Sequence, residues 1–107
     1  MAKRTPPVYP AARRQLAALG QRLRAARLRR DLTQAMLAER VGVTVPTIAK
    51  LERGVATTSL STMLRVLNSL GFVTDIDALA ATDHLGRLLQ DNKMSRASTK
   101  RPLARRA

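Results

Sequence analysis

Apolar residues recur at intervals of three and four in the N-terminal part of the chain, which is the period of a helix with one buried face. Leu16, Leu19, Leu23 and Ala26 form such a stripe. The pattern predicts a long amphipathic helix over about residues 12–30, where Asp31 and Leu32 break the period. Arginines occupy much of the rest of this helix: Arg22, Arg24, Arg27, Arg29 and Arg30.

Three shorter helices are predicted next, and each begins at a residue suited to cap it. Thr33, Thr44 and Ser59 stand at these starts, where a side-chain oxygen accepts a hydrogen bond from a free backbone N–H of the first turn. Gly42 can adopt a positive φ after the first of these helices, and Pro46 fits the first turn of the second. The expected ends are Val41, Gly54 and Gly71, and the last helix has these apolar residues on one side: Leu60, Met63, Leu64, Leu67 and Leu70.

The pattern weakens after Gly71. Residues 72–77 fit either a short strand or the lead-in to another helix, whereas 77–81 and 84–94 are weakly helical. The N-terminal end is basic and proline-rich, and the C-terminal end is basic with few apolar residues, so both are predicted to be disordered arms. The expected organisation is therefore an arm at 1–11, a domain at 12–71, an extension at 72–94 and a tail at 95–107.

Composition favours a helical bundle over a sheet. Aromatic residues make up only 2% of the chain, as Tyr9 and Phe72, so Leu, Ala and Val must fill the core. The chain has no cysteine, which excludes disulfides and thiolate metal sites. Its apolar runs are far shorter than the roughly 20 residues needed to span a bilayer. Prolines follow the basic N-terminus in place of the apolar segment of a signal peptide, so a cytoplasmic, nucleoid-associated location is expected.

The formal net charge of +13 predicts attraction to polyanions. Nucleic acid is the leading partner and an anionic membrane surface the rival, although the basic first helix lacks the Trp or Phe typical of membrane-surface helices. An enzyme is not expected: His84 is the only histidine, and there is no phosphate-binding glycine pattern. Asp75, Asp77 and Asp83 form the one acidic cluster and fit helix-start charges. We expect no catalytic residue, cofactor or metal.

The segment TQAMLAERVGVTVPTIAKLERG, residues 33–54, predicts a helix-turn-helix. Ala38 is small where the two helices would approach most closely, and Gly42 makes the turn. The recognition helix is expected near Thr44–Arg53. The residues expected to wedge the two helices against the rest of the domain are apolar: Leu37, Val43, Ile48 and Leu51.

The stretches LTQAMLAERVGV, TIAKLERG and SLSTMLRVLNSLG resemble the Cro/cI phage-repressor (XRE) family of helix-turn-helix domains, over roughly residues 16–71. The resemblance implies an all-α, lambda-repressor-like bundle of about five helices that binds double-stranded operator DNA as a dimer. It also implies that Gln34, at the start of the second helix, contacts a phosphate. The exposed face of the recognition helix and the backbone-contacting positions are implied to be Thr44, Val45, Pro46, Thr47, Ala49, Lys50, Arg53, Thr57, Thr58 and Ser59.

The residue chemistry of this face agrees with DNA contact. Lys50 can donate to guanine O6 or N7, and threonine hydroxyls can serve phosphates or base edges. Val45 and Ala49 suit only a thymine methyl, and the family often carries Gln, Asn or Arg where Val45 and Pro46 stand. DNA shape and backbone contacts are therefore expected to carry more of the specificity. In this family the residue at Glu52 often pairs with an arginine of the first helix, here Arg24 or Arg27.

The flanking stretches VYPAARRQLAALGQRLR and TTSLSTMLRVLNSLGFVTDIDAL resemble HipB-type antitoxins, the partners of HipA-type toxin kinases. In those proteins a short strand after the fourth helix pairs across the dimer, and residues 72–77 occupy its place. Two functions remain open: the antitoxin and autorepressor of a HipBA-like operon, or a stand-alone phage-repressor-type regulator. The residues expected in the dimer contact extend past the four-helix core: Leu70, Phe72, Val73, Ile76 and Leu79.

Overall fold

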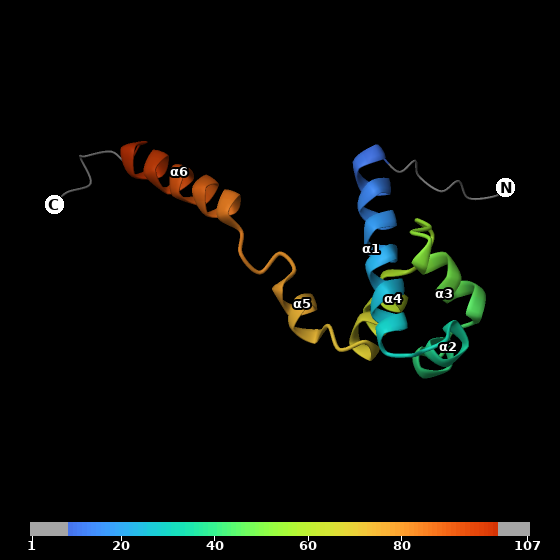
Figure 1. Cartoon of the computed structure of the whole chain (residues 1–107). Helices are drawn as coiled ribbons and strands as arrows, with labels where there is room; N and C mark the ends of the chain where they lie inside the picture. The colour runs from blue at the N-terminus through green and yellow to red at the C-terminus, as the bar shows by residue number, and fades with distance from the viewer. Residues whose placement is uncertain (1–8, 101–107) are drawn as a thin grey trace. The chain divides into compact units, whose positions relative to one another are not determined.

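The computed structural model describes residues 9–100, and side chains as far as residue 97. Every regular element in this part of the chain is a helix (Figure 1). The chain divides into two compact units, one ending at Ile76 and the other beginning at Asp77. The helices are α1 (Pro10–Arg29), α2 (Gln34–Val41), α3 (Val45–Glu52), α4 (Leu60–Ser69), α5 (Val73–Ala78) and α6 (His84–Lys100).

The predicted caps are confirmed at all three short helices. The side-chain oxygen of Thr33 accepts from the N–H of Met36 at 3.1 Å, and that of Ser59 accepts from Thr62 at 3.1 Å. Thr44 caps α3 in the same way, at 3.3 Å from the N–H of Thr47. Gly42 ends α2 with a φ of 79°, in the left-handed region expected of it. The helix borders of the domain are therefore encoded locally.

The core of the first unit lies where α1 to α4 meet. α1 packs against α3, and α2 packs against both α3 and α4. Arg65 of α4 reinforces this arrangement by donating from Nη1 to the carbonyl oxygen of Val41, at 3.2 Å. The buried apolar residues are aliphatic, as the composition predicted: Leu23, Ala26, Leu32, Leu37, Ala38, Val41, Ile48, Leu51, Val66 and Leu70.

The ambiguous segment 72–77 is helical, and the strand alternative is wrong. The N–H of Ile76 donates to the carbonyl oxygen of Phe72 at 3.0 Å, which closes a helical turn within the segment. This helix, α5, ends at Ala78, and Ala80 has a φ of 55°. The separate helix predicted over 77–81 is therefore wrong. A short helix therefore stands where a strand could have paired with another strand.

α6 begins at the predicted His84 and continues six residues beyond the predicted end, to Lys100. Asp83 caps it, because the N–H of Gly86 donates to Asp83 Oδ1 at 2.8 Å. Residues 95–100, expected to be disordered, are helical; Arg, Ala and Lys are good helix formers, which explains the extension. The arm at 1–8 and the tail at 101–107 lie outside the described residues. No helix among residues 9–100 is long and apolar enough to cross a membrane.

Candidate nucleic-acid interface

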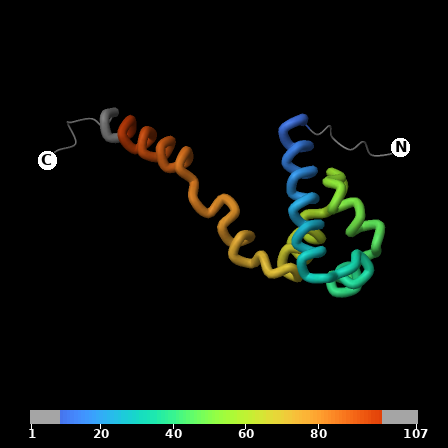
Figure 2. Tube along the Cα trace, in the orientation of Figure 1, coloured from blue at the N-terminus to red at the C-terminus, as the bar shows by residue number. Residues whose placement is uncertain are grey.

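α2 and α3 form the predicted helix-turn-helix (Figure 2). The N–H groups of Gly42 and Val43 both donate to the carbonyl oxygen of Ala38, at 2.8 and 3.0 Å, and these bonds close the turn. Leu37 and Ile48 are fully buried, and Val43 is half-buried against the same core. The predicted wedge is therefore in place, and it fixes the angle at which α3 leaves the turn.

A buried ion pair holds α3 against α1, and it uses Arg27 of the two candidate arginines. Arg27 Nε donates to Glu52 Oε2 at 2.6 Å, and a second guanidinium nitrogen donates to Oε1 at 3.0 Å. Arg27 also donates to the carbonyl oxygen of Leu32 at 2.7 Å. Both side chains are almost fully buried, at 7% and 3% exposure. A bidentate geometry with further hydrogen bonds is what makes a buried pair favourable.

The two partners shift each other's titration. Burial acts to raise the pKa of Glu52, but hydrogen bonds from Arg27 and Gln34 outweigh it and leave that pKa below its ordinary value. The hydrogen bond to Glu52 raises the pKa of Arg27 above its ordinary value, against the opposing effect of burial. Both groups are therefore charged at neutral pH, and the pair is an ion pair.

Gln34 has a structural contact where a phosphate contact was expected. Its Nε2 donates to Glu52 Oε1 at 3.0 Å, and its side chain is half-buried. The amide nitrogen is thus bound within the protein, and Gln34 joins α2 to the Arg27–Glu52 pair. The resemblance pointed to the position but not to this partner.

Two glycines allow α1 to cross the C-terminal end of α3 closely, and the sequence analysis missed this role for both. A Cβ on Gly20 would lie 2.5 Å from the carbonyl oxygen of Glu52. A Cβ on Gly54, whose φ is 74°, would lie 2.6 Å from the backbone nitrogen of Ala17. A glycine inside an otherwise helical pattern was the available signal at Gly20, because such a residue usually has a packing reason.

The outward face of α3 is exposed as predicted. Ile48 and Leu51 are buried inward, whereas Val45, Pro46, Lys50 and Arg53 are exposed and Thr47 and Ala49 are half-buried. The hydroxyl of Thr44 is already engaged, because it caps α3 and lies 2.9 Å from the hydroxyl of Thr47. Lys50 and Arg53 are therefore the long cationic side chains that this face presents to solvent.

A polar cleft of about 260 Å³ joins this face to the start of α4. The structure thus brings together residues of α3 and of the following loop that the sequence analysis had assigned to one surface. Ser59 contributes its hydroxyl to the α4 cap, and Thr62 is a lining residue that the sequence analysis did not single out. The cleft is lined by Thr47, Lys50, Thr57, Thr58, Ser59 and Thr62.

The expected dimer residues divide into buried and exposed ones. Leu70 is 2% exposed and belongs to the domain core, so it offers little surface for the expected dimer contact. Phe72 is half-buried against that core, and the guanidinium of Arg30 lies 5.6 Å from its ring centroid. Val73 and Leu79 are 50% and 70% exposed, and Ile76 is half-buried.

Comparison with known families matches residues 23–75 to the helix-turn-helix family. The matched segment includes α2, α3, α4 and the part of α1 that carries Arg27. No curated protein matches the chain. The match agrees with the Cro/cI resemblance of the sequence and with the geometry of the turn and the exposed face of α3. Through residues 23–75 the chain therefore belongs to the helix-turn-helix family, in its Cro/cI (XRE) branch of DNA-binding, transcription-regulating domains.

Proposed function

We propose that the chain regulates transcription by binding a specific double-stranded operator, with α3 in the major groove. The observation that carries this proposal is the division of α3 into two faces. Ile48 and Leu51 are 0% and 1% exposed, whereas Lys50 and Arg53 extend outward. An α-helix held by its inner face and exposed along its outer face fits the width of the major groove.

The roles within this surface follow from side-chain chemistry. Lys50 donates to guanine O6 or N7, and the half-buried Thr47 beside it contacts a base edge or phosphate. Val45 and Ala49 contact thymine methyl groups. Arg53 and Thr57 bind phosphates, and the polar cleft at the N-terminal end of α4, lined by hydroxyl groups and Lys50, accepts another phosphate.

We test these roles by separating specific from non-specific affinity. The operator is first selected from random duplex DNA, and competition with a mixed-sequence duplex gives the specificity ratio. Lys50→Ala is expected to lower that ratio by a factor corresponding to about 1–3 kcal/mol, because it removes a base contact. Arg53→Ala is expected to weaken binding to both duplexes about equally, because a phosphate contact carries no sequence information.

Glu39→Ala, at an exposed position of α2, serves as the matched surface control. An unchanged specificity ratio in Lys50→Ala would show that Lys50 does not contact bases. The absence of any preferred duplex after selection would contradict the proposed function itself.

We propose further that the protein acts as a two-fold dimer through residues beyond α4. One domain offers few base contacts, and two half-sites a helical turn apart, about 34 Å, double them. The exposed apolar side chains of Val73 and Leu79 and the half-buried Ile76 support this interface. Leu70 is excluded from it by its burial.

The antitoxin alternative rests on the region after the matched segment. α6 exposes Leu85, Leu88, Leu89 and Met94. The first three stand at i, i+3 and i+4 on one face of the helix, and an apolar face left exposed favours a protein partner. We propose a HipA-like toxin kinase as that partner. Co-expression with the neighbouring gene product distinguishes the two functions: a stable complex supports the antitoxin, and a toxicity-free neighbour with no complex supports the stand-alone regulator.

A further inference from the structure

The first turns of α1 lie outside the segment matched to the family, which begins at Leu23. α1 begins at Pro10, so more than three helical turns precede the match. These turns are described residues of the same compact unit as α3. They add a surface to which the family match assigns no role.

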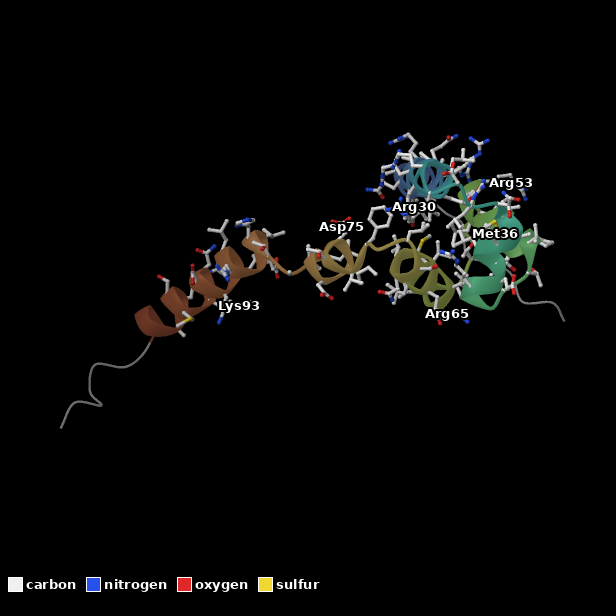
Figure 3. The ribbon with its side chains drawn as sticks, turned by 60° about the horizontal axis from the view of Figure 1, so that its bottom comes forward. Arg30, Met36, Arg53, Arg65, Asp75 and Lys93 are labelled. Atoms are coloured by element: carbon white, nitrogen blue, oxygen red, sulfur yellow. The ribbon has the colours of Figure 1, made fainter. Side chains whose placement is uncertain are left out.

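This added part of α1 runs beside the end of α3 and the loop that follows it (Figures 1 and 2). Gly54, at the start of that loop, approaches the backbone of Leu16 and Ala17 so closely that a Cβ would come within 2.7 Å of both residues. Gly20 faces the carbonyl oxygens of Leu51 and Glu52 in the same way. Arg53, labelled in Figure 3, directly precedes Gly54 and is exposed.

Helix periodicity places Arg13 on the face of α1 that meets this loop. Arg13 precedes Ala17 by four residues and Gly20 by seven, so the three positions share one face of the helix. Arg22 follows Arg13 by nine residues, about two and a half turns, and therefore lies on the opposite face. The close contacts at Ala17 and Gly20 direct the Arg13 face toward the α3–α4 loop.

Arg13 is also free to bind a ligand. Its side chain is exposed and has neither an ion-pair nor a hydrogen-bond partner within residues 9–97. Arg53, directly before the Gly54 that contacts α1, and Lys50, one turn earlier in α3, are exposed cations. An unpaired arginine next to two outward cations fits an extended anion and leaves no acidic partner to neutralise it.

We infer that Arg13 binds a phosphate of the DNA strand that flanks the operator contacts of α3, and so extends the footprint beyond the family's segment. The inference rests on the proposed function, because it places the same DNA against one more element. A planar guanidinium suits a phosphate through two parallel hydrogen bonds. The contact is sequence-independent, since it reaches the backbone only.

The test compares Arg13→Gln with Arg22→Gln, which removes the same charge from the opposite face of the same helix. Binding to a labelled mixed-sequence duplex of about 30 base pairs is followed by fluorescence anisotropy from about 50 to 200 mM KCl. Loss of one phosphate contact is expected to make the slope of log K against log salt shallower by about 0.9 and to weaken binding about fivefold to tenfold near 0.1 M salt. Arg22→Gln is expected to keep the wild-type slope.

Arg13→Lys keeps the charge and is expected to restore most of the slope, while circular dichroism confirms that each variant retains its helix content. Equal effects of Arg13→Gln and Arg22→Gln would overturn the inference, since the general positive field would then explain both. An unchanged slope in Arg13→Gln, with binding still weakened in Arg53→Ala, would overturn it and leave the proposed function intact. Failure of the wild-type protein to bind duplex DNA would contradict both this inference and the proposed function.

Discussion

At the residue scale, Arg27 connects more of the domain than any other polar side chain described above. It bonds Glu52 of α3 twice and the carbonyl oxygen of Leu32 once, and Glu52 in turn accepts from Gln34 of α2. Three segments thus meet at one guanidinium–carboxylate pair. Because the pair is buried, removing one partner leaves an uncompensated charge in the core.

This pair predicts a specific dependence of stability on pH. The pKa of Glu52 is lower in the folded protein than its ordinary value, so the pair contributes its full stability above about pH 4.3. That contribution is lost as the pH falls through the lowered folded pKa. We expect the thermal midpoint, measured by circular dichroism, to fall as the pH is lowered below the ordinary pKa of a glutamate.

Glu52→Gln is expected to lower the free energy of unfolding by about 3–5 kcal/mol at neutral pH and to flatten this acid transition. Glu39→Gln, which removes an exposed carboxylate from α2, is the control and should leave the acid transition nearly unchanged. An acid transition of the same steepness in Glu52→Gln would contradict the assignment to Glu52.

At the scale of elements, the sequence predicted the short helices well and the chain after Gly71 poorly. Thr33, Thr44 and Ser59 begin their helices through local hydrogen bonds. The residues next to each helix start are therefore enough to predict where the helix begins. Residues 72–77 have no comparable cap, and six residues fit one turn of helix or a strand equally well. The structure decides in favour of α5.

Helix periodicity predicts the exposed face of α3 as well as its buried face. Once Ile48 and Leu51 are assigned inward, helix periodicity places Lys50 and Arg53 outward. The partner of Gln34, the choice between Arg24 and Arg27, and the burial of Leu70 depend on how separate helices pack. No spacing within a single element contains that information.

The close crossing of α1 and α3 predicts that Gly20→Ala lowers the free energy of unfolding, whereas helix propensity alone predicts that it raises it. Gly20→Ala would gain about 1 kcal/mol from propensity alone. Because the new Cβ would meet the carbonyl oxygens of Leu51 and Glu52, we expect a net loss of about 1–3 kcal/mol in urea unfolding. Ala18→Gly, at an exposed position of the same helix, measures the propensity difference in place. A higher urea midpoint for Gly20→Ala would contradict the close crossing.

At the scale of the whole molecule, the two units differ in how their apolar side chains are used. The first unit buries ten apolar residues in one cluster, whereas α6 leaves Leu85, Leu88 and Leu89 exposed. The second unit therefore does not bury its own apolar side chains. The proposed dimer and the proposed toxin partner are two ways of covering apolar surface outside the DNA-binding domain.

The dimer is tested with Val73→Asp, because Val73 is half-exposed on α5 and does not belong to the core. A charge there is expected to raise the dimer dissociation constant at least about tenfold, which sedimentation velocity measures over a concentration series. Leu28→Asp, at 46% exposure on α1, is the matched control and should leave the dimer unchanged. A monomer in the wild-type protein, or an unaffected dimer in Val73→Asp, would move the interface away from α5.

The division of α3 into an inner and an outer face has a consequence for how such a regulator can diversify. Val45, Pro46 and Lys50 contribute neither to the apolar cluster nor to the buried ion pair. Under the proposed function, substitutions at these positions are therefore expected to change the sequence preference at little cost in folding free energy. Because the exposed face of α3 is separate from the core, duplicated copies of the domain could acquire new operators while they keep the same fold.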